Sequence, residues 1–109
     1  MNLHFKEVGD FPEIITELLT DHEYAVLQNE LRKNPEKGSL IQGTGGARKV
    51  RAKAGNKGKS GGVRVVYYFQ VEETIWMLAA YPKSRKSDLT EKDKKALKLF
   101  IEGIKGDRK

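Results

Sequence analysis

The residues best suited to chemistry in this chain are basic, and several of them alternate along one predicted strand. In residues 47–53 (ARKVRAK), Lys49, Arg51 and Lys53 are separated by apolar residues and therefore share one face. Arg64 lies on the next predicted strand. Arginine stays protonated and binds phosphate oxygens in pairs, whereas lysine acts as an acid or a base once its pKa is lowered. These residue types predict a site that binds phosphate and stabilises negative charge.

Charge is unevenly distributed along the 109 residues. Residues 1–36 carry eight acidic and three basic side chains, a balance of −5, whereas residues 37–71 carry eight basic side chains and no acidic one. Residues 72–109 carry ten basic and seven acidic side chains, a balance of +3. Such segregation predicts a polyanion-binding surface, with nucleic acid as the leading candidate. A solvated, lysine-rich loop is the alternative interpretation.

Length and composition narrow the function classes further. A chain of 109 residues is long enough to bury one modest hydrophobic core, so we expect a single domain over residues 1–109. The absence of cysteine excludes a disulfide, a thiolate zinc site and a cysteine nucleophile. His4 and His22 lie outside the basic region, which holds neither a histidine pair nor a carboxylate cluster, so we expect no metal and no cofactor. With no signal-peptide core and no membrane-length apolar stretch, we expect a soluble, cytoplasmic protein.

The hydrophobic periodicity predicts an α+β domain whose helices pack on one face of a sheet. Its expected elements are a short strand over residues 3–8, two helices in hairpin sequence between 10 and 34, a glycine-rich connection over 36–46, an antiparallel three-strand meander over 47–53, 63–71 and 74–81 with a tight turn at Glu72-Glu73, and a C-terminal helix capped by Thr90. Capping boxes are expected at Asp10–Glu13 and Thr20–Glu23.

A glycine- and lysine-rich stretch, residues 53–64 (KAGNKGKSGGVR), joins the first two strands of the predicted meander. Its Gly58-Lys59-Ser60 does not form a P-loop, because Lys53 occupies the place of the first glycine and a strand follows instead of a helix. We interpret the stretch as a cationic hairpin tip. Its lysines, Lys57 and Lys59, can follow a nucleic-acid backbone, and its glycines let the main chain approach closely.

Three segments together resemble a known family: QGTGGARKVR (42–51), GKSGGVRVVYYF (58–69) and YPKSRKSDLT (81–90). They are similar to the RelE/ParE superfamily of bacterial toxin–antitoxin toxins, and most similar to its HigB-type branch. The resemblance implies a ribosome-dependent endoribonuclease that cleaves mRNA in the ribosomal A site. It also implies a cognate antitoxin of the HigA-like helix-turn-helix type, with operator DNA bound only through the antitoxin complex.

The resemblance also assigns roles to residues of this chain. Lys49 and Arg51 fall on the strand that lines the cleft in RelE-type toxins, and Arg64 falls on the arginine that binds the scissile phosphate. Lys83 and Arg85 lie in the loop where the family supplies further charge. Further RNA contacts are expected from Arg48, Lys53, Lys57, Lys59, Tyr68, Tyr81 and Arg85.

The match is looser after the last strand of the meander. Ser84 lies near a position where RelE-type toxins have an arginine, and Thr90 lies where RelE has a catalytic tyrosine. This departure leaves the identity of the general base open.

The 2′-hydroxyl of RNA can serve as the nucleophile in a cleavage that uses no metal. Arg64 is then expected to stabilise the charge of the phosphorane, and Lys49 is the candidate base because neighbouring cations lower the pKa of a lysine. Lys83 or Arg51 is the candidate proton donor. Two alternatives remain open: a ParE-like gyrase inhibitor on the same fold, and a non-catalytic module that binds RNA or the ribosome.

Overall fold

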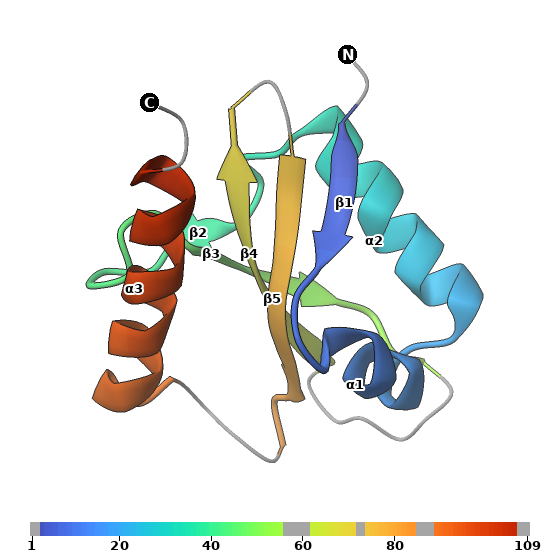
Figure 1. Cartoon of the computed structure of the whole chain (residues 1–109). Helices are drawn as coiled ribbons and strands as arrows, with labels where there is room; N and C mark the ends of the chain where they lie inside the picture. Colours follow the sequence, from blue (N-terminus) through green and yellow to red (C-terminus); the bar gives the residue numbers. More distant parts are fainter. Residues whose placement is uncertain (1–2, 56–61, 72–73, 85–88, 107–109) are drawn as a thin grey trace.

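The computed structural model describes residues 3–55, 62–71, 74–84 and 89–106. The expected turn at Glu72-Glu73 and the tip of the 53–64 hairpin fall outside these ranges. The described elements are β1 (His4–Glu7), α1 (Phe11–Leu18), α2 (Asp21–Lys33), β2 (Ser39–Leu40), β3 (Arg48–Ala52), β4 (Val63–Gln70), β5 (Thr74–Pro82) and α3 (Glu91–Gly106) (Figure 1). The α+β order predicted from the sequence is confirmed.

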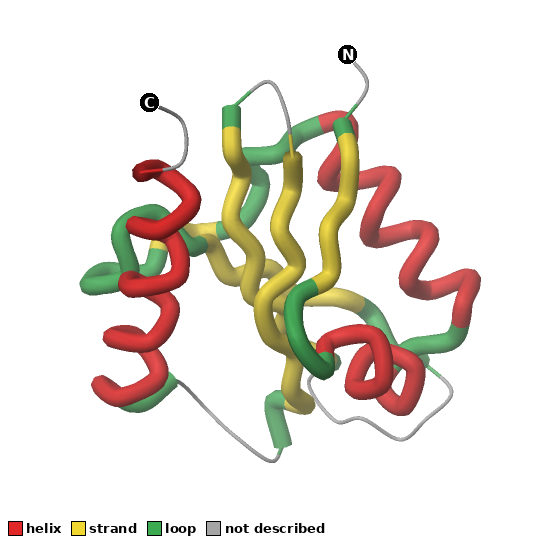
Figure 2. Tube along the Cα trace, viewed as in Figure 1, coloured by secondary structure: helices red, strands yellow, loops and turns green. Residues whose placement is uncertain are grey.

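The described strands form one mixed sheet in the order β1-β5-β4-β3-β2. β3, β4 and β5 pair antiparallel, as the predicted meander requires, and β1 runs parallel to β5 at one edge. The two-residue strand β2, at the other edge, was expected to be part of a glycine-rich connection. Figure 2 shows the strands side by side between helices on the two sides.

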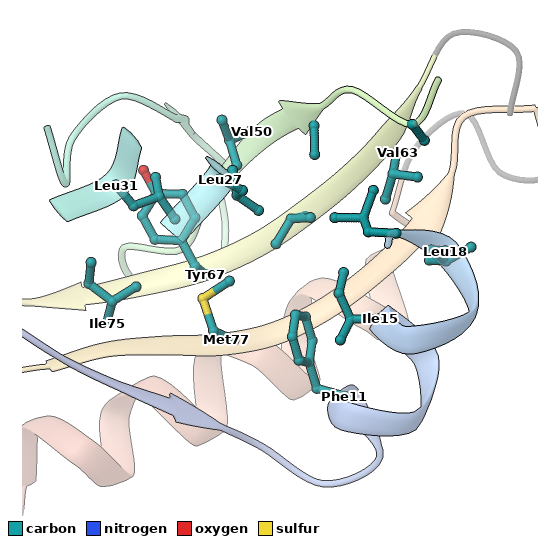
Figure 3. Packing of buried hydrophobic residues seen from close by; sticks show 14 of the residues in the cluster. Phe11, Ile15, Leu18, Leu27, Leu31, Val50, Val63, Tyr67, Ile75 and Met77 are labelled. Carbon is teal, nitrogen blue, oxygen red and sulfur yellow. The ribbon is translucent and has the colours of Figure 1, made fainter. Parts of the chain in front are cut away.

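One face of the sheet packs against α1 and α2. Phe11, Ile15 and Leu18 of α1, together with Leu27 and Leu31 of α2, are all buried in one cluster. The sheet contributes the inward side chains of three strands to this cluster, several of which Figure 3 shows on their strands: Val50, Ala52, Val63, Val65, Tyr67, Ile75 and Met77.

The expectation that all helices share one face is wrong, because α3 covers the opposite face (Figure 1). Val66 and Ile101 belong to a second buried cluster on that side. β4 is therefore covered on both faces: its consecutive residues Val65 and Val66, which project from opposite faces, are each 0% exposed. A strand that is buried on both faces reads as a continuous apolar run, and VVYYF (65–69), which follows Arg64, is such a run.

The helix starts follow local side-chain chemistry only in part. At α2, the Thr20 hydroxyl accepts from the Glu23 backbone N–H at 3.1 Å, and the Thr20 N–H donates to the Glu23 carboxylate at 2.8 Å, so that capping box is confirmed. The box expected at Asp10 is wrong. Asp10 has φ −91° and ψ 12° instead of an extended backbone, and its side chain makes no capping hydrogen bond.

Replacing Thr20 with alanine is expected to lower the free energy of unfolding by about 1 kcal/mol, because the Glu23 N–H loses its acceptor. Asp10→Ala is the matched control, since it removes an N-cap side chain that makes no such bond. Urea denaturation followed by circular dichroism measures both. Equal losses in the two variants would contradict this account of the helix starts.

Candidate functional site

Arg51, Arg64 and Tyr81 form one row across the meander. Arg51 of β3 pairs directly with Arg64 of β4, and Arg64 pairs with Tyr81 of β5. Residues opposite one another in an antiparallel pair project from the same face, with Cβ atoms roughly 5 Å apart. Tyr81 belongs to the cluster beneath α3, so the row lies on the α3 side of the sheet.

Lys49 lies in a parallel row on the same face. It is two residues from Arg51 along β3 and pairs with Val66, which in turn pairs with Ala79. Val66 and Ala79 both belong to the α3-side cluster, which confirms the face. Lys49 and Arg64 are half-buried, whereas Arg51 is exposed. The structure therefore brings together three of the cations that the sequence predicted as catalytic.

Lys83 joins this group at the hairpin end of the meander. Its backbone N–H donates to the Gly62 carbonyl at 3.1 Å, which continues the pairing of β4 with β5 past Pro82. Gly62 also lies against Arg51: an added Cβ would be 3.1 Å from the Arg51 Nε. Arg51 therefore extends over Gly62, next to the start of β4 and the end of β5. Sequence reasoning missed this role of Gly62.

The pairing of two arginines has an energetic cost. Like charges directly opposite each other in a sheet are destabilising, typically by a few tenths of a kcal/mol to about 1 kcal/mol. Arg51 and Arg64 are such a pair, and Lys49 adds a third positive charge on the same face. A bound anion such as a phosphate group relieves this repulsion and supplies acceptors for both guanidinium groups. The arrangement is suited to hold a phosphate and to stabilise additional negative charge on it.

The residues predicted to contact RNA are dispersed. Arg48 pairs with Tyr67 and so lies on the α1 and α2 side of the sheet, away from Lys49 and Arg51. Lys53 is exposed just past the end of β3. Lys57, Lys59 and Arg85 lie outside the described residues.

The two tyrosines on the α3 side are held by packing. An added Cβ on Gly46 would be 3.1 Å from a ring carbon of Tyr68, which shows that the ring lies against that glycine. Tyr81 is only 8% exposed. Both side chains are therefore half-buried or buried parts of the α3-side cluster.

The QGTGG segment that precedes β3 has a structural role that sequence reasoning did not assign. Thr44 is fully buried, and its hydroxyl donates to the Ile41 carbonyl at 2.7 Å and accepts from the Ala47 N–H at 3.0 Å. Lys105 of α3 donates to the Gly45 carbonyl at 2.7 Å. The segment thus connects α3 to the start of the strand that carries Lys49. A single threonine among glycines was the available sequence signal.

Two cavities adjoin these elements. One of about 530 Å³ lies between α2 and the end of β3, with Arg51 and Lys53 in its lining, and one of about 380 Å³ lies between β5 and α3, with Tyr81 in its lining. In the described ranges, no three histidine or carboxylate side chains gather as a metal site. Over the same ranges, no helix is long and apolar enough to cross a membrane.

Fold and site together define a small α+β protein with a cationic cluster on a sheet flanked by helices. A family model described as the RelE toxin of the RelE/RelB toxin–antitoxin system matches residues 19–105. The chain therefore belongs to the RelE toxin family, and it is a toxin of a type II toxin–antitoxin system. Membership implies a cognate antitoxin as a partner protein.

Proposed function

We propose that this protein is a ribosome-dependent endoribonuclease of the HigB-type branch, which cleaves mRNA in the A site and so inhibits translation. The observation that carries the proposal is the row in which Arg51 and Arg64 face each other, with Lys49 beside it and Lys83 at its end. The same cations are the ones that the resemblance to RelE-type toxins designates as catalytic.

In this proposal the nucleophile comes from the substrate. Lys49 removes the proton of the 2′-hydroxyl, and the resulting oxygen attacks the adjacent phosphorus in line with the leaving 5′-oxygen. Arg64 stabilises the negative charge that builds on the phosphoryl oxygens, and Arg51 or Lys83 donates a proton to the leaving oxygen. The products are a 2′,3′-cyclic phosphate and a 5′-hydroxyl, and no metal takes part.

The ribosome is proposed to supply what this small site lacks. The described cations can bind and polarise a phosphate, but in-line attack also needs the RNA backbone held in one specific conformation. A message held in the A site provides that orientation. The partner is proposed to be a HigA-like antitoxin, with operator DNA contacted only by the complex of both proteins.

The chemistry of the new RNA ends tests this mechanism. We expect the upstream fragment to carry a 2′,3′-cyclic phosphate and the downstream fragment a 5′-hydroxyl, because the 2′-oxygen is the attacking atom. A single 2′-deoxy substitution at the cleaved position is expected to stop the cut there. Polynucleotide kinase labelling, with and without phosphatase treatment, identifies the 5′ end.

Chelation is the companion measurement. In a binding assay with labelled RNA and no ribosomes, EDTA is expected to leave the affinity of the protein for RNA unchanged. In the cleavage assay on programmed ribosomes, where magnesium is retained, a zinc-selective chelator is expected to leave the cleavage rate unchanged. A 5′-phosphate on the downstream fragment, or cleavage of the 2′-deoxy message, would contradict the mechanism.

A further inference from the structure

The segment between α2 and β2 lies directly against the strand that carries Lys49. Gly38, at its end, is buried, and an added Cβ there would be 2.9 Å from the Lys49 carbonyl oxygen and 3.0 Å from the Tyr67 ring. Only a hydrogen fits in this space. The next residue, Ser39, pairs with Lys49 across β2 and β3. The main chain of Lys49 is therefore flanked by β4 on one side and by this segment on the other.

Tyr67 is hydrogen-bonded to this segment through its hydroxyl group. Its hydroxyl accepts a hydrogen bond from the Gly38 N–H at 2.9 Å and donates one to the Pro35 carbonyl at 2.8 Å. Tyr67 is 0% exposed, and its burial raises the pKa of the hydroxyl above the ordinary value. The hydroxyl therefore keeps the proton that the bond to Pro35 requires.

Arg48 is hydrogen-bonded to the same segment through its guanidinium group. Its Nη1 donates to the Gly38 carbonyl at 2.7 Å and to the Glu36 carbonyl at 3.1 Å, and its Nη2 lies 3.8 Å from the Glu36 carboxylate. The Arg48 side chain is 19% exposed. Its polar contacts are thus directed at the segment between α2 and β2, on the face of the sheet opposite Lys49.

We propose that Arg48, Tyr67 and Gly38 form a clamp that fixes the main chain of Lys49, and that Arg48 is a positioning residue for the candidate base and does not contact RNA. The inference rests on the proposed function for the role of Lys49. β2 has only two residues, too few to stay paired with β3 by its own ladder. Without the clamp, Lys49 would lie on a free sheet edge, and a misplaced catalytic group loses much of its effect.

The test compares Arg48→Met, Arg48→Lys and Tyr67→Phe with the unchanged protein. Amide hydrogen exchange of the free protein is expected to rise about tenfold at Gly38, Ser39 and Lys49 in Arg48→Met and Tyr67→Phe, because each loses hydrogen bonds to the segment. Exchange at Val66, in the middle of β4, is expected to stay unchanged. Arg48→Lys, which can still donate to one carbonyl, is expected to show a smaller rise.

Cleavage and RNA binding separate positioning from contact. In Arg48→Met, the single-turnover cleavage rate on programmed ribosomes is expected to fall about tenfold or more, with partial recovery in Arg48→Lys. Binding of a 2′-O-methyl RNA oligonucleotide is expected to keep both its affinity and its salt dependence. Lys33→Met, which removes an exposed charge at the end of α2, is the control for net charge.

A weaker affinity for the oligonucleotide, with a salt slope reduced by about 0.7, would overturn the proposal and make Arg48 a phosphate contact. Unchanged exchange at Gly38, Ser39 and Lys49 would overturn it as well, and so would a uniform rise that includes Val66. The exchange experiment uses no RNA. If the unchanged protein cuts no message, the proposed function fails while the clamp is still judged by exchange.

Discussion

Replacing Arg64 with glutamine is expected to reduce cleavage of ribosome-bound message by about a hundredfold to a thousandfold. Arg64 stands between Arg51 and Tyr81 in the row on the α3 side of the sheet, with Lys49 on the same face. Glutamine keeps a polar side chain of similar length but removes the charge that stabilises the phosphorane. Single-turnover rates on programmed ribosomes measure the effect.

The same substitution is expected to leave the protein folded at the assay temperature, because Arg64 is half-buried and glutamine keeps a polar side chain of similar length there. Arg32→Gln is the matched control. Arg32 lies on α2, donates to the Asn29 side chain at 2.8 Å, and packs over the Phe5 ring. Full activity in Arg64→Gln, or an equal loss in Arg32→Gln, would remove Arg64 from the catalytic group.

Gly62→Ala is expected to impair both folding and cleavage. Gly62 has φ +80°, a conformation that costs an alanine roughly 1–2 kcal/mol. The new Cβ would also lie 2.9 Å from the Ala52 carbonyl oxygen and 3.1 Å from the Arg51 Nε. We expect a loss of about 2 kcal/mol or more in the free energy of unfolding, and a slower cleavage rate at temperatures where the variant is still folded.

Gly55→Ala is the control for this prediction, because it lies in the same connection between β3 and β4. Nothing lies within 4 Å of a Cβ added at Gly55, so a methyl group is accommodated. Its N–H, which donates to the Glu23 carboxylate at 2.9 Å, is retained in alanine. When both variants are measured, Gly62→Ala is expected to unfold more easily and to cleave more slowly than Gly55→Ala. Similar behaviour of the two would contradict the role assigned to Gly62.

The elements were predictable because their periodicity is local, and apart from the capping box at Asp10 the errors arose where distant contacts decide. The alternation in ARKVRAK correctly predicted β3, and the Thr20 capping box correctly predicted the start of α2. β2 has no pattern of its own, since it exists through the contacts that Arg48 and Tyr67 make with residues 35–38. The side of the sheet taken by α3 depends on packing between parts of the chain that are far apart in sequence.

The candidate site was predictable in composition but not in arrangement. Alternation places Lys49 and Arg51 on one face, and the same rule places Arg48 on the other, although it was grouped with the RNA contacts. That Arg51 faces Arg64 depends on the register of the hairpin between them, and a shift by one residue would separate the two. No periodicity in the sequence determines that register.

Thr90, which the resemblance places at the position of RelE's catalytic tyrosine, caps a helix in this structure. The Thr90 hydroxyl accepts from the Asp93 N–H at 3.1 Å, and the Thr90 N–H donates to the Asp93 carboxylate at 2.9 Å. The cap of α3 predicted at Thr90 is therefore confirmed. With this hydroxyl engaged at a helix start, Lys49 remains the base that the proposal names.

The most direct test of the central claim is to map 5′ ends on a message during translation in a reconstituted reaction with the purified protein. We expect cuts in codon register that depend on ribosomes and are lost with Arg64→Gln. Equal cutting with Arg64→Gln, or an intact message with the unchanged protein, would contradict it, and inhibition of gyrase or simple RNA binding would then become the leading function for this fold.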